Sequence, residues 1–446
     1  MSPAAGEASV LDASRRATDN SGAMQTGTAM RVSYDAQGRR VLTHPEADTI
    51  TRAVLVERAR ALVPALRERA QRTEEARQLL PETLADFERA GFFRICQPRR
   101  FGGFEMGLDV LEAVLIEAGR GCGSSAWNLG ILAGHAWWAS MFPEEGQVEI
   151  FGGDGHALLP GGFLGGRGVA KRAEGGYEVA GRWPYQSGCD ASNWFGVSAS
   201  LEDEGDGPPA GLTFVVPAAD VRIEDDWFVL GMRGTGSKTV VIDQAFVPER
   251  RSLTLKSVEE QETPGSKVHA NPLYHAPVMA FISIEVTGAA VGVALQAVEV
   301  LDEIARAKPV RGRAGATQME SPIMRRRLAE AKSLAETARV LLLSEASRLM
   351  RMLEEYVPQG RKLSREEIGE YGLQNARIVD LCVGAVDHAF AAAGTSATFT
   401  GHPLERCFRD IHMISTHTVL RVDNTAESWG LAHFGLGGPP ATAEGR

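Results

Sequence analysis

Apolar residues recur at intervals of three and four along the first ordered part of the chain, with charged residues between them. This spacing places them on one face of an α-helix, and it is clearest at Val54, Leu55, Ala59, Leu62, Val63 and Leu66. Pro81 to Leu84 is typical of a helix start and Gly91 of a helix end. The paired Ser124 and Ser125 are expected to cap a further helix. Residues 49–150 are therefore predicted to be all-α.

The pattern changes at about Phe151. Glycine, valine, aromatic and turn residues then prevail as far as Pro248. Short alternating runs bounded by turn residues indicate strands, and they occur at Gly176–Gly181, Trp194–Ala199, Leu212–Val216 and Val240–Phe246. Residues 151–255 are therefore predicted to form a compact β domain.

Helical periodicity returns after about Val278, so residues 256–446 are predicted to be a helical bundle. Three long stretches rich in Ala, Leu and Val stand out: Gly288–Ile304, Arg325–Leu353 and Glu366–Ala393. Helices of this length with broad apolar faces are typical of a four-helix bundle.

The first 48 residues differ from the rest in composition. They are rich in Ala, Ser, Thr and Gly and contain no apolar run. We therefore predict a disordered tail, and no secretory signal, because a signal peptide needs an apolar central region.

Composition narrows the possible partners and the compartment. The net charge of −10 and the lack of a long basic stretch disfavour a nucleic-acid partner. No apolar run reaches the ~20 residues that span a bilayer, so no membrane partner is expected. Five widely spaced cysteines without a CxxC pair are typical of reduced thiols in the cytoplasm. The same spacing argues against a zinc site, so no metal is predicted.

The run from Leu230 to Ser237, with the sequence LGMRGTGS, carries the strongest chemical signal. Its glycines allow the backbone to approach a flat ligand closely. The turn also delivers two hydroxyls and an arginine ahead of a β-branched strand. A dinucleotide fingerprint and a P-loop lysine motif are both missing from the sequence. A flat cofactor would therefore be held by strands and helix ends rather than by a Rossmann unit.

This run resembles a strand signature of the acyl-CoA dehydrogenase fold, in the form carried by its two-component flavin-dependent monooxygenase branch. The segment Gly181–Asp190 (GRWPYQSGCD) and the Arg409-Asp410 pair resemble further motifs of that branch. The resemblance covers about residues 50–435 and includes the p-hydroxyphenylacetate hydroxylase oxygenase and dibenzothiophene monooxygenase families. It implies an α+β multidomain fold, with an N-terminal α domain, a middle β-barrel or sandwich and a C-terminal four-helix bundle.

The resemblance also implies a function. The chain would be the oxygenase component of a two-component monooxygenase, which receives reduced FMN or FAD by diffusion from a separate flavin reductase. O2 would add at the flavin C4a atom, and the resulting hydroperoxide would hydroxylate a small aromatic, phenolic substrate. A cytoplasmic homotetramer is expected.

Cofactor contacts follow from the same resemblance. Ser187 would be the hydrogen-bond partner of the flavin N5 and C4a region, although a serine in this context is also typical of a β-turn. Arg306, or else Arg311 or Arg313, would meet the flavin phosphate. Trp183 and Gly188 would lie beside the flavin ring. Pro160 and Gly161 belong to the Leu158–Gly162 strand, which would run along the flavin. Thr395 and Ser396 would lie near a neighbouring subunit's cofactor.

Two histidines complete the expected catalytic set with Ser187. Dehydrogenases of the family commonly carry a base glutamate about eight residues after the aspartate of the Arg-Asp pair. Thr418 stands there in this chain, and His417 precedes it. A neutral imidazole can accept a phenolic proton near neutral pH, so His417 is the expected base. His135, in a helix before a Phe-Pro pair, is the expected substrate contact, although a histidine among aromatic residues is also typical of a core.

Three alternatives remain open from the sequence. The first is oxygenation at nitrogen or sulfur by the same chemistry. The second is a true acyl-CoA dehydrogenase, for which Glu285 lies one turn from another family position of the base, although an intrahelical or intersubunit ion pair also fits this residue. The third is a non-catalytic flavin-binding or scaffolding relative.

Overall fold

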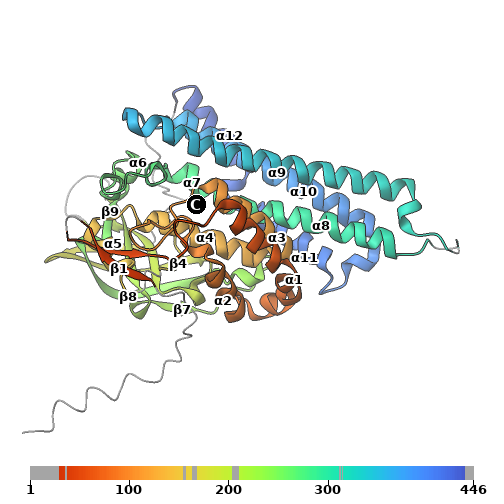
Figure 1. Ribbon diagram of the computed structural model, residues 1–446, viewed down its shortest axis with the longest axis horizontal. Helices are drawn as coiled ribbons and strands as arrows, with labels where there is room; N and C mark the ends of the chain where they lie inside the picture. The colour runs from red at the N-terminus through yellow and green to blue at the C-terminus, as the bar shows by residue number, and fades with distance from the viewer. Residues whose placement is uncertain are drawn as a thin grey trace, which may run out of the picture.

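The computed structural model describes residues 30–35, 38–153, 157–162, 168–202, 210–310, 313 and 315–436. The β-sheet lies at one end of the molecule, and the long helices of the C-terminal part extend away from it to the other end (Figure 1). The N-terminal helices lie between these two parts in the same view.

Five helices form the N-terminal part: α1 (Arg52–Ala76), α2 (Pro81–Ala90), α3 (Leu108–Gly121), α4 (Gly123–Ala139) and α5 (Glu144–Ile150). The predicted start at Pro81 and end at Gly91 are confirmed, with Gly91 in the left-handed conformation at φ 78°. The predicted cap at Ser124 and Ser125 is wrong. Both serines are buried inside α4, because Cys122 alone separates α3 from α4 and takes the N-cap position.

Order begins earlier than the expected boundary at residue 48. β1 (Arg31–Tyr34) and β2 (Arg40–Thr43) pair antiparallel. All four residues of β1 are exposed, so no buried face marks this strand in the sequence. The rest of the expected tail, residues 1–29, lies outside the described residues.

The middle of the chain forms one seven-stranded sheet in the order β7-β8-β4-β3-β5-β6-β9. All neighbouring strands run antiparallel except β3 and β5. The strands are β3 (Gly168–Ala173), β4 (Gly176–Gln186), β5 (Trp194–Leu201), β6 (Gly211–Pro217), β7 (Arg222–Glu224), β8 (Lys238–Pro248) and β9 (Ser252–Thr254). The four strands expected from the sequence are confirmed as β4, β5, β6 and β8, and the three others were not predicted.

The sheet has two edge strands, β7 and β9, so its described residues do not close into a barrel. Its buried apolar residues nevertheless form a core of their own that includes Val179, Phe195, Phe214 and Ile242. A flat sheet cannot bury a core without a second layer, so this sheet curls over itself. Two register shifts in β4, one on each side of Trp183, contribute to the bend.

Seven helices follow the sheet: α6 (Leu255–Glu259), α7 (Val278–Ile284), α8 (Thr287–Ala307), α9 (Pro322–Tyr356), α10 (Arg365–Ala393), α11 (Pro403–Ile414) and α12 (Val422–His433). The three long helices expected from the sequence are confirmed as α8, α9 and α10. These three pack on one another, and α11 packs against α8 and α10.

The helices on both sides of the sheet share one hydrophobic core. It joins Leu55 of α1 and Leu111 of α3 to Leu342 of α9 and Ile411 of α11. The N- and C-terminal helical parts are therefore a single packing unit, although the sequence separates them by the whole sheet. The expected division into two helical domains remains a prediction.

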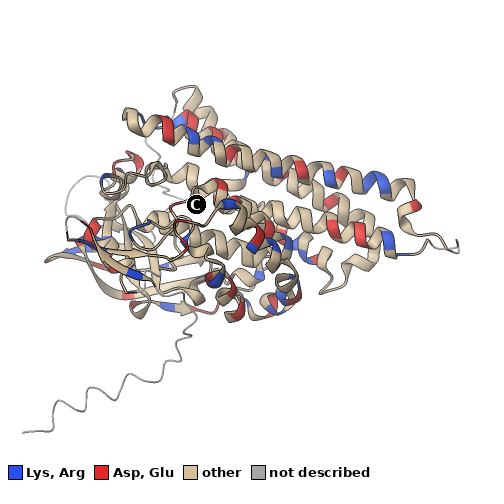
Figure 2. Ribbon diagram, in the orientation of Figure 1, with Lys and Arg blue, Asp and Glu red and all other residues tan. Residues whose placement is uncertain are grey.

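The charge distribution and the hydropathy of the helices are consistent with this packing. Acidic and basic residues are interspersed along the ribbon of α9 (Figure 2). Two helical segments, Val278–Ala307 and Arg365–Thr398, are long and apolar enough to cross a membrane by length and composition alone. Of the most apolar 18-residue stretch, 89% is buried inside the protein in the first segment, as in a core helix, and 39% in the second.

Candidate functional site

Three hydroxyls form a chain at the turn between β7 and β8. A short 3-10 turn, Arg233–Thr235, presents Thr235, and Gly236 in the left-handed conformation then reverses the backbone. The Thr235 and Ser237 hydroxyl oxygens lie 2.6 Å apart. Ser237 in turn lies 2.8 Å from the hydroxyl oxygen of Ser187, just beyond β4. Two sequence motifs that are 50 residues apart thus meet through side-chain hydroxyls.

Trp127 of α4 connects this chain to His417. The indole Nε1 donates a hydrogen bond to Ser187 Oγ at 3.1 Å. The same indole lies edge-on to the His417 ring, with centroids 5.4 Å apart. The expected flavin partner and the expected base therefore share one neighbour, and sequence analysis missed it. Trp127 lies 60 positions from Ser187, so no local spacing could have revealed the contact.

His417 follows α11 and caps the short turn Thr418–Leu420. The His417 side chain remains exposed in the single chain, but Trp127 packs against part of its ring. This desolvation lowers the pKa of His417 below the ordinary histidine value. The imidazole is consequently neutral near pH 7 and can accept a proton.

The structure corrects the expectation for Trp183. Its indole is buried in the core of the sheet and donates to the Ser198 carbonyl at 2.8 Å, so it is not the aromatic residue beside Ser187. Tyr185 takes that place and is 69% exposed. The reason is local: β4 is irregular after Trp183, and Tyr185 has φ 64°, which breaks the alternation of sides.

Local geometry explains why glycine stands at position 188. Its φ of 77° is in the left-handed region, and an added Cβ would lie 3.2 Å from Leu132. The next residue, Cys189, donates to the Gly236 carbonyl at 3.3 Å. Burial raises the pKa of this thiol to about 12, so Cys189 is an inert filler.

His135 is placed deep in the helical core, away from the hydroxyl chain. Eight residues of α4 separate it from Trp127, which corresponds to about 12 Å along the helix. Its Nδ1 lies 2.8 Å from the Leu159 carbonyl, which can only accept, so Nδ1 carries the proton. Its Nε2 lies 3.4 Å from Glu285 Oε1. The substrate role of His135 remains a prediction, and Glu285 forms a buried pair within the chain instead of an intrahelical or intersubunit one.

The Leu158–Gly162 segment runs beside β5. Gly196 donates its backbone N–H to the Pro160 carbonyl at 2.9 Å, and Gly161 forms a parallel bridge with Gly196. A Cβ on Gly161 would lie 2.3 Å from the Trp138 ring. Close packing on Trp138 thus explains Gly161, and the flavin contact expected for this segment remains a prediction.

The C-terminal ends of α8 and α10, next to the expected phosphate contacts in the sequence, lie at the end of the helical bundle that is remote from the sheet (Figure 1). Arg306 is exposed and pairs with Asp302 at 2.8 Å. Lys308, which sequence analysis did not single out, donates to Ser396 Oγ at 3.1 Å, and Thr395 is exposed beside it. Within a single chain, these expected phosphate contacts do not lie beside Ser187. Of the two alternatives to Arg306, Arg313 pairs with Glu320 at 3.7 Å and Arg311 lies outside the described residues.

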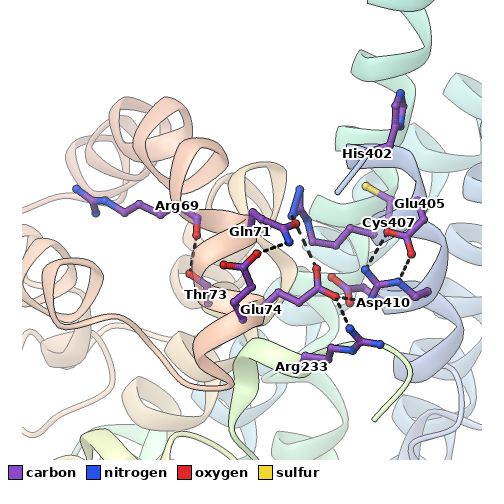
Figure 3. Close-up of polar contacts among 12 residues, drawn as sticks. Arg69, Gln71, Thr73, Glu74, Arg233, His402, Glu405, Cys407 and Asp410 are labelled. Atoms are coloured by element: carbon purple, nitrogen blue, oxygen red, sulfur yellow. Dashed lines mark hydrogen bonds and ion pairs between the residues drawn. The ribbon is translucent and has the colours of Figure 1, made fainter. Parts of the chain in front are cut away.

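A cluster of charged residues fixes the turn that carries the hydroxyls (Figure 3). Asp410 of α11 accepts the Met232 backbone N–H at 2.5 Å. Its neighbour Arg409 donates to the Leu230 carbonyl at 2.9 Å and pairs with Glu74 of α1 at 2.6 Å. The Arg-Asp motif thus anchors the turn from both sides.

These residues fit a flavin. Ser187 provides a hydroxyl just after β4, Gly188 follows it in the left-handed conformation, and the exposed aromatic residue Tyr185 precedes Ser187 by two positions. Among the described residues, no group of three or more His, Cys, Asp and Glu side chains could hold a metal ion.

Comparison with known proteins agrees with the fold. Residues 284–422 match the family model described as the acyl-CoA dehydrogenase C-terminal domain. The chain is 33% identical over 383 residues to a pigment production hydroxylase from Rhodococcus sp., covering 85% of this chain and 96% of the relative. It is 30% identical over 401 residues to the oxygenase component of an FADH2-dependent resorcinol hydroxylase from Rhizobium sp., covering 87% and 96%.

Among solved structures, XiaF from Streptomyces sp. in complex with FADH2 and glycerol superimposes with a TM-score of 0.80. The two chains are 27% identical, and the match covers 88% of this chain and 97% of XiaF. The acyl-CoA dehydrogenase-like fold is therefore confirmed. Within that fold, the chain belongs to the family of oxygenase components of flavin-dependent monooxygenases.

Proposed function

We propose that this protein hydroxylates a small phenolic substrate, using reduced flavin delivered by a separate reductase. The observation that carries the proposal is the contact of Trp127 with both Ser187 and His417. This contact supports the proposal because one indole joins Ser187, the proposed hydrogen-bond partner of the flavin, to His417, the proposed base. The name of the resorcinol hydroxylase supports a phenolic substrate.

His417 would accept the phenolic proton, which makes the ring carbon electron-rich enough to be hydroxylated. Reduced flavin, when bound, supplies the activation of O2 for this transfer. Trp127 would hold the imidazole edge-on to its own ring and limit the orientations of His417. Ser187 would hydrogen-bond the flavin, and Tyr185 would cover part of its ring.

The dehydrogenase alternative has less support. Such an enzyme needs a carboxylate base near the flavin, but Thr418 occupies one family position and Glu285 is paired with His135 in the helical core. Oxygenation at nitrogen or sulfur would leave the neutral base at His417 without a role. Phenol hydroxylation uses both the hydroxyl and the imidazole.

A homotetramer is part of the proposal. Only 39% of the most apolar 18-residue stretch within Arg365–Thr398 is buried in one chain, which leaves surface for a neighbour to cover. The exposed Phe399 adds to this surface. A neighbouring chain would also bring Lys308, Thr395 and Ser396 to the flavin phosphate, with Arg306 beside them. Sedimentation velocity measures the assembly, and a monomer would contradict this part. A cytoplasmic location remains a prediction.

The function is tested by adding O2 and a panel of phenols to the protein with chemically reduced FMN or FAD. We expect a product that is heavier by one oxygen atom, with at least one phenol. We also expect the protein to bind reduced flavin more tightly than oxidised flavin. Stoichiometric oxidised FAD that stays bound through purification and is reduced by an acyl-CoA would instead establish a dehydrogenase.

Replacing Ser187 with Ala should uncouple the reaction. The change removes one hydrogen bond to the flavin, worth about 0.5–1.5 kcal/mol. We expect more hydrogen peroxide per hydroxylated product, measured by peroxide assay and product chromatography. The melting temperature should also fall, because the buried Trp127 N–H loses its acceptor. A lower melting temperature with unchanged coupling would make Ser187 a structural turn residue only.

A further inference from the structure

The hydroxyl chain has a donor at one end and an acceptor at the other. At one end, the Trp127 indole can only donate, and it donates to Ser187 Oγ. At the other end, the Met232 carbonyl can only accept, and it lies 2.9 Å from the Thr235 hydroxyl. The order of the protons between these ends follows from counting, since each hydroxyl has a single proton.

Thr235 donates its proton to the Met232 carbonyl, so its oxygen accepts from Ser237 at 2.6 Å. The Ser237 proton is then used, so its oxygen accepts from Ser187 at 2.8 Å. In this order the Trp127 N–H and the three hydroxyl protons are all paired within the protein. The reversed order loses the bond to the Met232 carbonyl and leaves the Ser187 proton without a protein partner. Because Ser187 is mostly buried, the first order is favoured.

We propose that Thr235 and Ser237 are positioning residues that direct the Ser187 proton inward, so that Ser187 offers the flavin a lone pair and thereby selects reduced flavin. A hydroxyl oxygen has two lone pairs, and Trp127 occupies one of them. Reduced flavin carries a proton on N5 and can donate to the second. Oxidised flavin has only a lone pair at N5, so two acceptors would face each other.

This inference rests on the proposed function and adds a reason for its cofactor preference. An oxygenase that receives reduced flavin by diffusion must not be blocked by the oxidised form. In this chain, two hydroxyls that do not face the flavin themselves would provide that discrimination. Their effect passes entirely through Ser187.

The test measures the dissociation constants of oxidised and reduced FMN and FAD, the reduced forms under anaerobic conditions. In Ser237→Ala and in Thr235→Val, the Ser187 proton becomes free to turn outward. We expect oxidised flavin to bind about threefold to tenfold more tightly, the worth of one hydrogen bond, and reduced flavin to bind about as before. A tenfold fall in the dissociation constant of oxidised flavin relative to that of reduced flavin lowers the midpoint potential of the bound flavin by ~30 mV.

Controls separate this effect from damage to the turn, which would weaken the binding of both forms. Thr213→Val removes a buried hydroxyl of the same domain that donates to the Val197 carbonyl, and it should leave the ratio unchanged. Thr235→Ser retains the hydroxyl and should retain the wild-type ratio. Adding Ser237→Ala to Ser187→Ala should have no further effect, because the two act in series.

The outcomes are distinct. If wild-type protein binds reduced flavin and yields product, but neither Ser237→Ala nor Thr235→Val strengthens the binding of oxidised flavin, the inference is overturned and the function stands. If Thr235→Ser changes the ratio as Thr235→Val does, the methyl group and not the hydroxyl matters, which also overturns it. If the wild-type protein neither binds reduced flavin nor forms an oxygenated product, the proposed function itself fails.

Discussion

His417→Ala is expected to lower product formation by roughly 10²-fold or more, the usual loss when a positioned acid–base group is removed. The binding of reduced flavin should persist, because His417 touches the hydroxyl chain only through Trp127. The measurement is the rate of product formation in single-turnover experiments with premixed reduced flavin. A pH profile gives a second readout. Wild-type activity should fall as the pH drops through the lowered pKa of His417, and this acid limb should vanish in the variant.

His412→Ala is the matched control. This histidine lies on α11, five residues before His417, and pairs with Asp387 at 3.1 Å on the surface. Its removal should leave turnover and the acid limb unchanged. If Glu285→Gln abolished turnover while His417→Ala did not, the base would lie where the dehydrogenase alternative puts it.

Asp410→Ala should destabilise the protein by about 1–3 kcal/mol, the scale for leaving a buried donor without its acceptor. Asp410 is 4% exposed and accepts the N–H of Met232, a non-glycine residue at φ 52°. The variant would leave that N–H unpaired and free the turn that carries Thr235 and Ser237. Denaturant unfolding measures the loss in stability, and flavin titration should show weaker binding of both redox forms.

Asp410→Asn separates the hydrogen bond from the charge, because the amide oxygen can still accept from Met232. Burial raises the pKa of Asp410 from 3.8 to about 6. An acid with a raised pKa in the folded state loses stability as the pH rises through this interval. Above pH 6, Asp410→Asn should therefore equal or exceed the wild type, by up to about 3 kcal/mol. At pH 4 that advantage should vanish, and a variant as unstable as Asp410→Ala at every pH would contradict this account.

Element types were predictable where an apolar pattern extends over many residues. The long helices α8 to α10 and the strands β4, β5, β6 and β8 all bury one or both faces, and burial is what periodicity records. β1 was missed because it buries nothing. The prediction for Ser124 and Ser125 was wrong because they resemble caps but lie within the first turn of α4, whose N-cap is Cys122.

The candidate site was predictable only in part. Ser187 and His417 could be named from their motifs, but not the indole that joins them, because that contact depends on how three distant segments pack. Trp183 was chosen over Tyr185 because strand alternation gives no sign of the irregularity that turns Tyr185 outward. Contacts of this kind could not be predicted because the partners lie far apart in the sequence, and not because of their chemistry.

The contact of Trp127 with Ser187 and His417 also bears on how the protein can fail. Trp127 and His417 belong to the helical parts, which share one core, and Ser187 belongs to the sheet, so neither the helices nor the sheet alone contains the site. A slight separation of the sheet from the helices would leave helices and strands intact and break the hydrogen bond between Trp127 and Ser187. Circular dichroism would then report a native protein that has no activity. In a heated or aged sample, emission from the tryptophans should change before the far-ultraviolet signal does, and catalysis should be lost with the first of these signals.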